Sequence, residues 1–339
     1  MNIYTLQKLY GKIRSPRVKL LALLLLHLGR RRYAVLDLDP VMACNLRCRM
    51  CYFSDENHRR KSGGRMSEDD LAAISRNVFP AVRKLQIGCG AEPTLFSGLE
   101  GIVAEAKKKG VPYISLTTNG QLLTAERLER LVETGLDEIT VSAHGLSADV
   151  YESMMPGARF EKFLDLTRSL ASVREKHPRF QIRFNYTVNE DNMQDLPLLG
   201  TVFSDVVPDI VQIRPVQCIG ESDYRNFSKK KILEHYGRYM PPVVEFCRKH
   251  GARCIYPSKE NLASVDGTTV TDTTNHIADD LPLLYMAPCK EWPELDPHKE
   301  DFRQYCRRTH RVGTMLRVIF GLDPGRHKNR SKTMNYDIR

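Results

Sequence analysis

The stretch "VMACNLRCRMCYFSD" places three cysteines, Cys44, Cys48 and Cys51, within eight residues. In a long chain with nine cysteines, such spacing serves metal or redox chemistry more often than disulfide formation. Structural zinc would need a fourth ligand, but the next cysteine, Cys89, follows a different predicted strand. A redox pair would need only Cys48 and Cys51. Three thiolates on an iron–sulfur cluster would instead leave one iron open to bind and polarise a small molecule.

The cysteines belong to a region that alternates short β-rich runs with longer amphipathic helical patterns. Strands separated by helices predict an α/β fold with parallel strands and right-handed crossovers, which we interpret as a partial (β/α)6 TIM-like barrel. Ligands of such sheets bind where the strands end, and the cysteines come directly after the first strand. The six predicted strands are "YAVLDLD" (33–39), "KLQIG" (84–88), "YISLTT" (113–118), "EITVSA" (138–143), "QIRFNYTV" (181–188) and "DIVQIRPV" (209–216).

Residues 34–216 resemble the radical S-adenosylmethionine (radical SAM) superfamily. The resemblance rests on Cys44-x3-Cys48-x2-Cys51 after the first strand of a βα array, with "CNLRC" close to the family's commonest wording. It implies that the three cysteines hold a [4Fe-4S] cluster whose fourth iron chelates S-adenosylmethionine. The implied activity is reductive cleavage of that cofactor to a 5′-deoxyadenosyl radical, which abstracts hydrogen from a substrate. The alternative function is a non-catalytic metal-binding module attached to membrane or nucleic acid through basic ends.

Several further motifs resemble those that bind S-adenosylmethionine in this family. "GCGAEPTL" (88–95) is similar to its "GGEP" stretch, which implies that Glu92 accepts from the cofactor's ammonium group. Small residues there let the backbone approach the ligand closely. Three family positions depart from the usual pattern, because Ala91 replaces a glycine, Met50 an aromatic residue and Met155 an arginine. The cofactor-binding residues implied by the resemblance are Gly90, Ala91, Glu92, Thr118, Asn119, Ser142 and, for its ring, Tyr52.

Residues 217–339 are expected to form a smaller irregular unit with a basic tail, either degenerate or similar to a SPASM or twitch extension. A second iron–sulfur cluster there would use Cys254, Cys289 and Cys306, with Cys218 as a substitute ligand. The other interpretation is that these thiols only pack. Cys218, just past the sixth strand, is also the one candidate for a catalytic hydrogen donor to a substrate radical.

The net charge of +10 is concentrated at the two ends. Residues 1–33 hold eight Lys or Arg and no acid, and residues 303–339 hold ten Lys or Arg and two acids. Basic ends around a mildly acidic middle favour contact with an anionic surface. Nucleic acid is not an expected partner, because the basic stretches lack interleaved stacking aromatics.

The leucine-rich run "LLALLLLHLG" (20–29) lies in a predicted N-terminal helix within residues 1–33. The run is too short to span a bilayer, which needs about 20 apolar residues. Two interpretations stay open: the leucines lie in a membrane interface, or they pack on the barrel. We expect a cytoplasmic chain, peripheral on the inner membrane face if the first holds. Its expected partners are a small-molecule, glycan or peptide substrate and an electron donor of flavodoxin or ferredoxin type.

Overall fold

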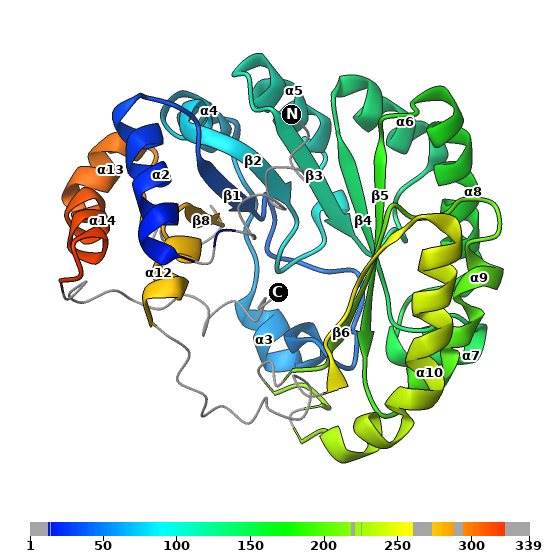
Figure 1. Cartoon of the computed structure of the whole chain (residues 1–339). Coiled ribbons are helices and arrows are strands. Elements are labelled where there is room, and N and C mark those ends of the chain that lie inside the picture. The colour runs from blue at the N-terminus through cyan, green and yellow to red at the C-terminus, as the bar shows by residue number, and fades with distance from the viewer. Residues whose placement is uncertain are drawn as a thin grey trace.

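The computed structural model contains one sheet of eight parallel strands in the order β7-β6-β5-β4-β3-β2-β1-β8 (Figure 1). It describes residues 13, 15–217, 221–224, 226–259, 273–287 and 294–322. Within these ranges the sheet is open, with β7 and β8 as its two edges. The strands are β1 (Ala34–Leu38), β2 (Val82–Ile87), β3 (Tyr113–Thr118), β4 (Glu138–Ala143), β5 (Gln181–Val188), β6 (Ile210–Pro215), β7 (Arg253–Ile255) and β8 (Leu283–Met286).

The α/β fold with a partial barrel of parallel strands is confirmed, and all six predicted strands are present as β1 to β6. The number of strands is corrected from six to eight, because β7 pairs with β6 and β8 pairs with β1. Strand order therefore continues past residue 217, where it was expected to stop. Both added strands are short, so neither shows the periodicity by which a strand is detected in a sequence. The division into units at residues 33 and 217 stays a prediction.

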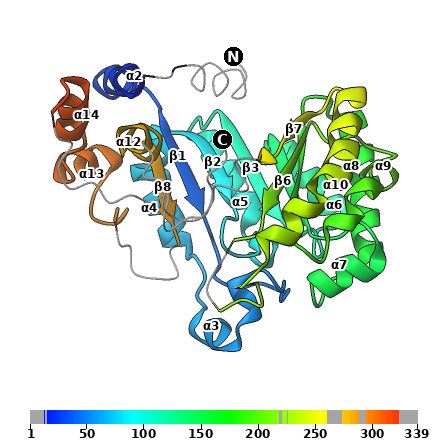
Figure 2. The same ribbon diagram turned by 60° about the horizontal axis from the view of Figure 1, so that its bottom comes forward.

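Helices on the outer side of the sheet connect successive strands (Figures 1 and 2). The first helix of this layer begins with a capping box, in which the side chains of Ser67 and Asp70 each bond the other residue's backbone N–H. The helices of this layer are α4 (Glu68–Asn77), α5 (Leu99–Lys108), α6 (Ala125–Thr134), α7 (Ala148–Met154), α8 (Phe160–Lys176), α9 (Leu199–Val202) and α10 (Lys229–His250). Four more gather beside β1 and β8: α2 (Pro16–Leu28), α12 (Thr273–Asp280), α13 (Phe302–Arg308) and α14 (Arg311–Ile319).

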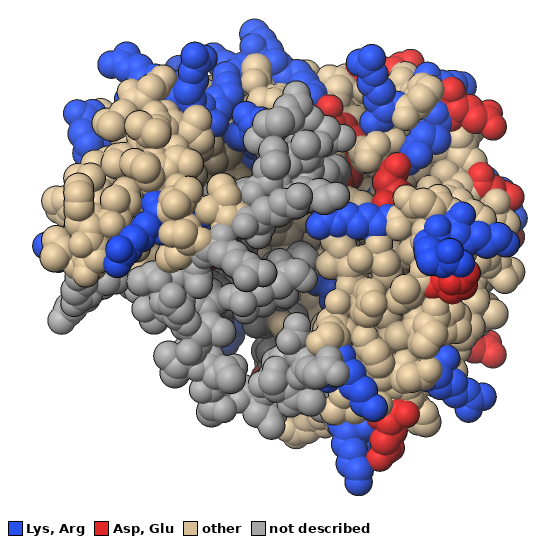
Figure 3. Space-filling model, in the orientation of Figure 1, with Lys and Arg blue, Asp and Glu red and all other residues tan. Residues whose placement is uncertain are grey.

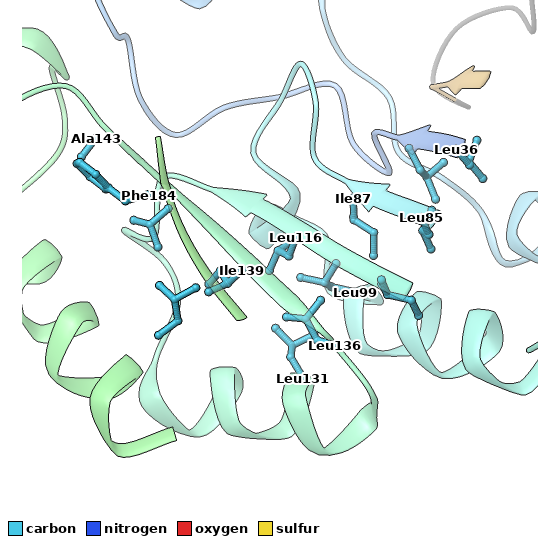
Figure 4. Packing of buried hydrophobic residues seen from close by; sticks show 14 of the residues in the cluster. Leu36, Leu85, Ile87, Leu99, Leu116, Leu131, Leu136, Ile139, Ala143 and Phe184 are labelled. Atoms are coloured by element: carbon cyan, nitrogen blue, oxygen red, sulfur yellow. The ribbon is translucent and has the colours of Figure 1, made fainter. Parts of the chain in front are cut away.

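The outer face of the sheet carries the hydrophobic core. Side chains of alternate strand residues, such as Leu85, Leu116 and Ile139, are fully buried against Leu99 of α5 and Leu131 of α6 (Figure 4). The same alternation turns the neighbouring residues toward the inner face. The apolar side chains of these strands therefore pack against the helices, and the polar side chains face the interior of the partial barrel.

The inner face is polar, in contrast to TIM barrels, whose interior is filled by branched apolar side chains. Tyr113 of β3 donates to the carboxylate of Glu138 of β4 at 3.0 Å. The guanidinium of Arg183 of β5 lies 3.5 Å from the same carboxylate and donates to Gln212 of β6 at 3.3 Å. Burial raises the pKa of Glu138 to about 7 and lowers the pKa of Lys84 to about 8. The interior of the sheet is thus lined by polar groups, and burial there favours the neutral forms of Glu138 and Lys84.

The raised pKa of Glu138 predicts a pH dependence of stability. The unfolded chain releases this proton near pH 4.5, whereas the folded chain holds it up to about pH 7. The stability contributed by the proton is therefore present below pH 4.5 and lost as the pH rises to 7. Glu138→Gln, which keeps a neutral amide, should lose less stability than the wild type between about pH 5 and about pH 8 in urea unfolding. An identical pH dependence in both proteins would contradict the buried state of Glu138.

Candidate active site

The cysteine loop, residues 40–51, follows the C-terminal end of β1. Cys51 N donates to the carbonyl of Cys48 at 2.9 Å, and Leu46 N approaches Cys44 Sγ at 3.4 Å. All three cysteines are free and half-buried. Burial raises the pKa of Cys44 to about 12 and also raises the pKa values of Cys48 and Cys51. Neutral thiols at this site would become thiolates once a metal cation bound them.

The three sulfurs are not all as close as the ligands of a single ion. Sulfurs that share one tetrahedral zinc lie about 3.8 Å apart, given Zn–S bonds of about 2.3 Å. Among the described residues, the one group of three donors within 4.8 Å of one another is Glu129, Glu133 and His177, on the outer helices. At least one pair of sulfurs in the cysteine loop is therefore more than 4.8 Å apart. This spacing is compatible with thiolates that each bind a different iron.

Asp39, the residue after β1, fixes the loop that follows β2. Its side chain is fully buried and accepts hydrogen bonds from Cys89 N at 2.8 Å and Gly90 N at 2.9 Å. Tyr285 of β8 donates a third bond to the same carboxylate at 2.8 Å. Burial raises the pKa of Asp39, and these hydrogen bonds oppose that rise. Three strand ends are joined through one carboxylate.

Gly90 lies where no side chain fits. A Cβ at this position would be 2.5 Å from the hydroxyl of Tyr52 and 3.2 Å from Asp39 Oδ2. Tyr52 in turn donates to the carbonyl of Gly90, so the cysteine loop is bonded directly to the loop after β2. The glycine thus lets the side chains of Tyr52 and Asp39 come close to the backbone. The predicted close approach of a ligand to this loop stays a prediction.

Glu92 joins the loops after β2 and β3. Its buried carboxylate accepts from Thr94 N and Oγ1 at 3.1 and 2.5 Å, from Thr118 Oγ1 at 2.6 Å and from Asn119 N at 2.8 Å. Burial raises the pKa of Glu92, and these bonds lower it. Asn119 extends the contact to the cysteine loop, since its Nδ2 lies 2.9 Å from Asn45 Oδ1 and 3.9 Å from Cys44 Sγ. The expected bond from Glu92 to an ammonium stays a prediction.

The far side of the cysteine loop is bonded to the segment after α7. Arg47 N and Arg49 N donate to the carbonyls of Pro156 and Met154, both at 3.0 Å. Buried Asn189, after β5, donates to Met50 Sδ at 2.8 Å and to Met154 Sδ at 3.5 Å. The loop is therefore held from both sides before any ligand binds.

The predicted cofactor-binding residues fall into two groups. Those after β2 and β3 are brought together beside the cysteines by the bonds described above, as is Tyr52. Ser142 lies half-buried on the inner face of β4, where Asn185 is its neighbour on β5. Its expected contact with the cofactor stays a prediction. Met155, which replaces the family's arginine, is 1% exposed and belongs to the core.

The expected second cluster is corrected in part. Cys254 lies on β7, where it contacts Cys247 of α10, whereas Cys306 lies on α13, 3.8 Å from the hydroxyl of Tyr33. These elements are on opposite sides of the molecule in Figure 2, so Cys254 and Cys306 cannot ligate one cluster. Cys218 and Cys289 lie outside the described residues.

Three residues of the site escaped prediction from the sequence. Asp39 carried a usable signal, because it is a charged residue at the end of a strand that leads into the cysteine motif. Asn189 follows β5 in the same way. Tyr285 carried none, because its strand was not predicted and its partner is 246 residues away in the sequence.

Comparison with known proteins shows which proteins this site resembles. Residues 40–182 match the model of the Radical SAM superfamily. It is 30% identical over 282 residues to Fe-coproporphyrin III synthase of Methanosarcina barkeri, covering 80% of this chain and 62% of the relative. It is 32% identical over 219 residues to a probable GTP 3′,8-cyclase of Metallosphaera sedula, covering 61% and 64%. The chain thus spans less than two thirds of these curated relatives.

Solved structures show the same fold. Streptococcus suis SuiB bound to S-adenosylmethionine superposes with a TM-score of 0.54 at 15% identity, covering 76% of this chain and 58% of that one. Native anSMEcpe with bound AdoMet and Cp18Cys peptide gives a TM-score of 0.54 at 17% identity, covering 88% and 86%. At these identities the likeness concerns the fold.

The Asp39–Tyr285 bond predicts how the site responds to one lost hydroxyl. Tyr285→Phe removes one of three donors to a buried carboxylate, which should lower the free energy of unfolding by about 1–3 kcal/mol at neutral pH. The amides of Cys89 and Gly90 should then exchange hydrogen faster, because their acceptor is less firmly held. Urea unfolding and hydrogen exchange measure the two effects. The control is Tyr256→Phe, at an exposed tyrosine; equal effects of both changes would contradict a specific role for Tyr285.

Proposed function

We propose that this chain is a radical SAM enzyme that cleaves S-adenosylmethionine reductively and abstracts hydrogen from a substrate bound within the partial barrel. The observation that carries the proposal is the hydrogen bonding of three loops around Cys44, Cys48 and Cys51. Held by these thiolates, a [4Fe-4S] cluster would supply one electron to the sulfonium, releasing methionine and a 5′-deoxyadenosyl radical.

The chain's own residues would bind and orient the cofactor. Gly90 and Ala91 would let the backbone lie close to the cofactor, on a loop that is held by the hydrogen bond from Gly90 N to Asp39 and by the hydrogen bond from Tyr52 to the Gly90 carbonyl. Glu92 bonds Thr118 and Asn119, and Asn119 lies beside Cys44. The loops after β2 and β3 are therefore held at a set distance from the cysteine loop before a cofactor binds. A site that is organised before binding lowers the reorganisation required at the moment of reaction. These residues position the reactants, and the radical chemistry comes from the cofactors.

The substrate proposed is polar: a small molecule, a lipid-linked glycan or a peptide. Support comes from the inner face of the sheet, where Thr140, Asn185 and Gln212 follow the charged group around Glu138. The single electron would come from a donor of flavodoxin or ferredoxin type. We place the reaction in the cytoplasm, where reducing conditions keep thiols free; all described cysteines are free.

Anaerobic reconstitution tests the proposal directly. The wild-type chain, supplied with iron, sulfide, dithionite and S-adenosylmethionine, should bind about four irons and form 5′-deoxyadenosine. Cys48→Ala should lose cleavage by at least about a hundredfold and should bind iron weakly, because one thiolate ligand of the cluster is missing. Iron analysis, Mössbauer spectroscopy and chromatography of the products measure these outcomes.

The matched control is Cys254→Ala, which removes a half-buried thiol on β7, away from the cysteine loop. It should retain both iron content and cleavage. Zinc bound by four side chains in the anaerobically purified chain would overturn the proposal in favour of a metal-binding module. Cleavage that survives Cys48→Ala would overturn the cluster assignment.

A further inference from the structure

Helix α2 has two apolar faces, and one of them is exposed. Leu20, Leu23, Leu24 and His27 are buried on the side that packs on the body of the molecule. Val18, Leu21, Leu25 and Leu28 recur at spacings of three and four residues, so they form one stripe on the opposite side. This leucine stripe is 44–63% exposed. Only some of the leucine side chains of this run therefore pack in the core.

Further exposed apolar side chains lie at the end of α14, a helix that packs against α2 (Figure 1). A Cβ at Gly321 would lie 2.9 Å from the guanidinium of Arg17, so the chain after α14 reaches the first turn of α2. Phe320 and Leu322, on either side of Gly321, are 73% and 62% exposed. Eight of the eleven exposed large hydrophobic side chains among the described residues lie on α2 or at the end of α14. Such clustering marks an interaction surface.

The charges near the stripe are mostly positive. Neither α2 nor α14 contains an acidic residue, although Lys19 of α2 pairs with Asp279 of α12 at 3.1 Å. In Figure 3 the surface over α2 is mostly uncharged, and Lys and Arg gather around the upper end of this helix. A cavity of about 220 Å³ opens at the C-terminal end of α2. Its lining includes four arginines and one acid, namely Arg30, Arg31, Arg76, Arg303 and Asp301. An anionic group would be attracted to this cavity while apolar chains met the stripe.

We propose that the leucine stripe, with Phe320 and Leu322, docks on an anionic membrane surface and that the arginine-lined cavity takes a lipid phosphate. Charge complementarity favours lipid over a second copy of the chain, because two copies would bring like charges together. Among the described residues, no helix is long and apolar enough to cross a membrane, so the contact is interfacial.

The position of α2 leaves the candidate active site open. Helix α2 leads into the N-terminal end of β1, whereas the cysteine loop follows the other end. Figure 2 places α2 and the short helix α3 (Glu56–Lys61), which follows the cysteine loop, at opposite ends of that strand. Docking through the stripe would therefore attach the chain without covering the cysteines. Membrane contact and S-adenosylmethionine cleavage are accordingly measured by separate experiments.

Vesicle sedimentation tests the proposal with the full-length chain. It should bind vesicles of phosphatidylcholine with phosphatidylglycerol, bind phosphatidylcholine alone less, and be released by salt. Leu25→Glu with Leu28→Glu should weaken binding by at least about tenfold, because two exposed apolar side chains become charged and are repelled by the surface. Arg30→Gln with Arg31→Gln should reduce the preference for vesicles with phosphatidylglycerol. This variant should still bind vesicles of phosphatidylcholine alone as weakly as the wild type does. Inorganic phosphate, added as a competitor, should displace little protein, since it offers nothing to the stripe.

The matched control is Leu198→Glu, at a leucine that is 38% exposed on the far side of the sheet, and it should bind as the wild type does. Thermal unfolding of each variant verifies that the fold is kept. Equal binding by the stripe variant and the control would overturn the proposal. So would a dimer in sedimentation equilibrium that the stripe variant dissociates, because a second copy would then be the occupant.

Discussion

Two buried carboxylates, Asp39 and Glu92, determine the arrangement on which the candidate site depends. A carboxylate without hydrogen-bond donors is costly to bury, so each must be surrounded by several. Asp39 obtains its donors from the β2 loop and β8, and Glu92 obtains its donors from its own turn and the β3 loop. Because the donors come from different strand ends, satisfying the two charges also fixes the loops around the cysteines.

The sequence predicted the main strands because their apolar residues alternate with polar ones, and both faces of the sheet turn out to use that alternation. Leu116 and Ile139 face the helices, whereas Tyr113 and Glu138 face the interior. The edge strands could not be predicted in this way. Strand β7 has three residues and β8 has four, so neither is long enough to establish a period. Their existence depends on pairing with β6 and β1, which is a long-range interaction.

The parts of the candidate site that lie close together in the sequence could be predicted, whereas contacts between distant segments could not. Cys44, Cys48 and Cys51 are recognisable because one loop must supply all three thiolates, so their spacing is written in the sequence. Tyr285 supports the same site from a distant strand, and no local pattern records that contact. Glu92 is intermediate: its importance was visible, but its bonds to Thr118 and Asn119 appear only when two loops meet.

Helix α2 shows why composition alone left two interpretations open. A helix with leucine at most positions buries any face equally well, so hydrophobic content cannot say which residues meet the core. The structure divides them: Leu23 and Leu24 pack inward, whereas Leu25 and Leu28 remain outside. An exposed leucine does not stabilise the folded state more than a polar residue at the same position would. It does increase the risk of aggregation. Four such residues in one stripe, on a helix that holds no acidic residue and is followed by three arginines, are the basis of our proposal of a partner that is apolar and negatively charged at its surface.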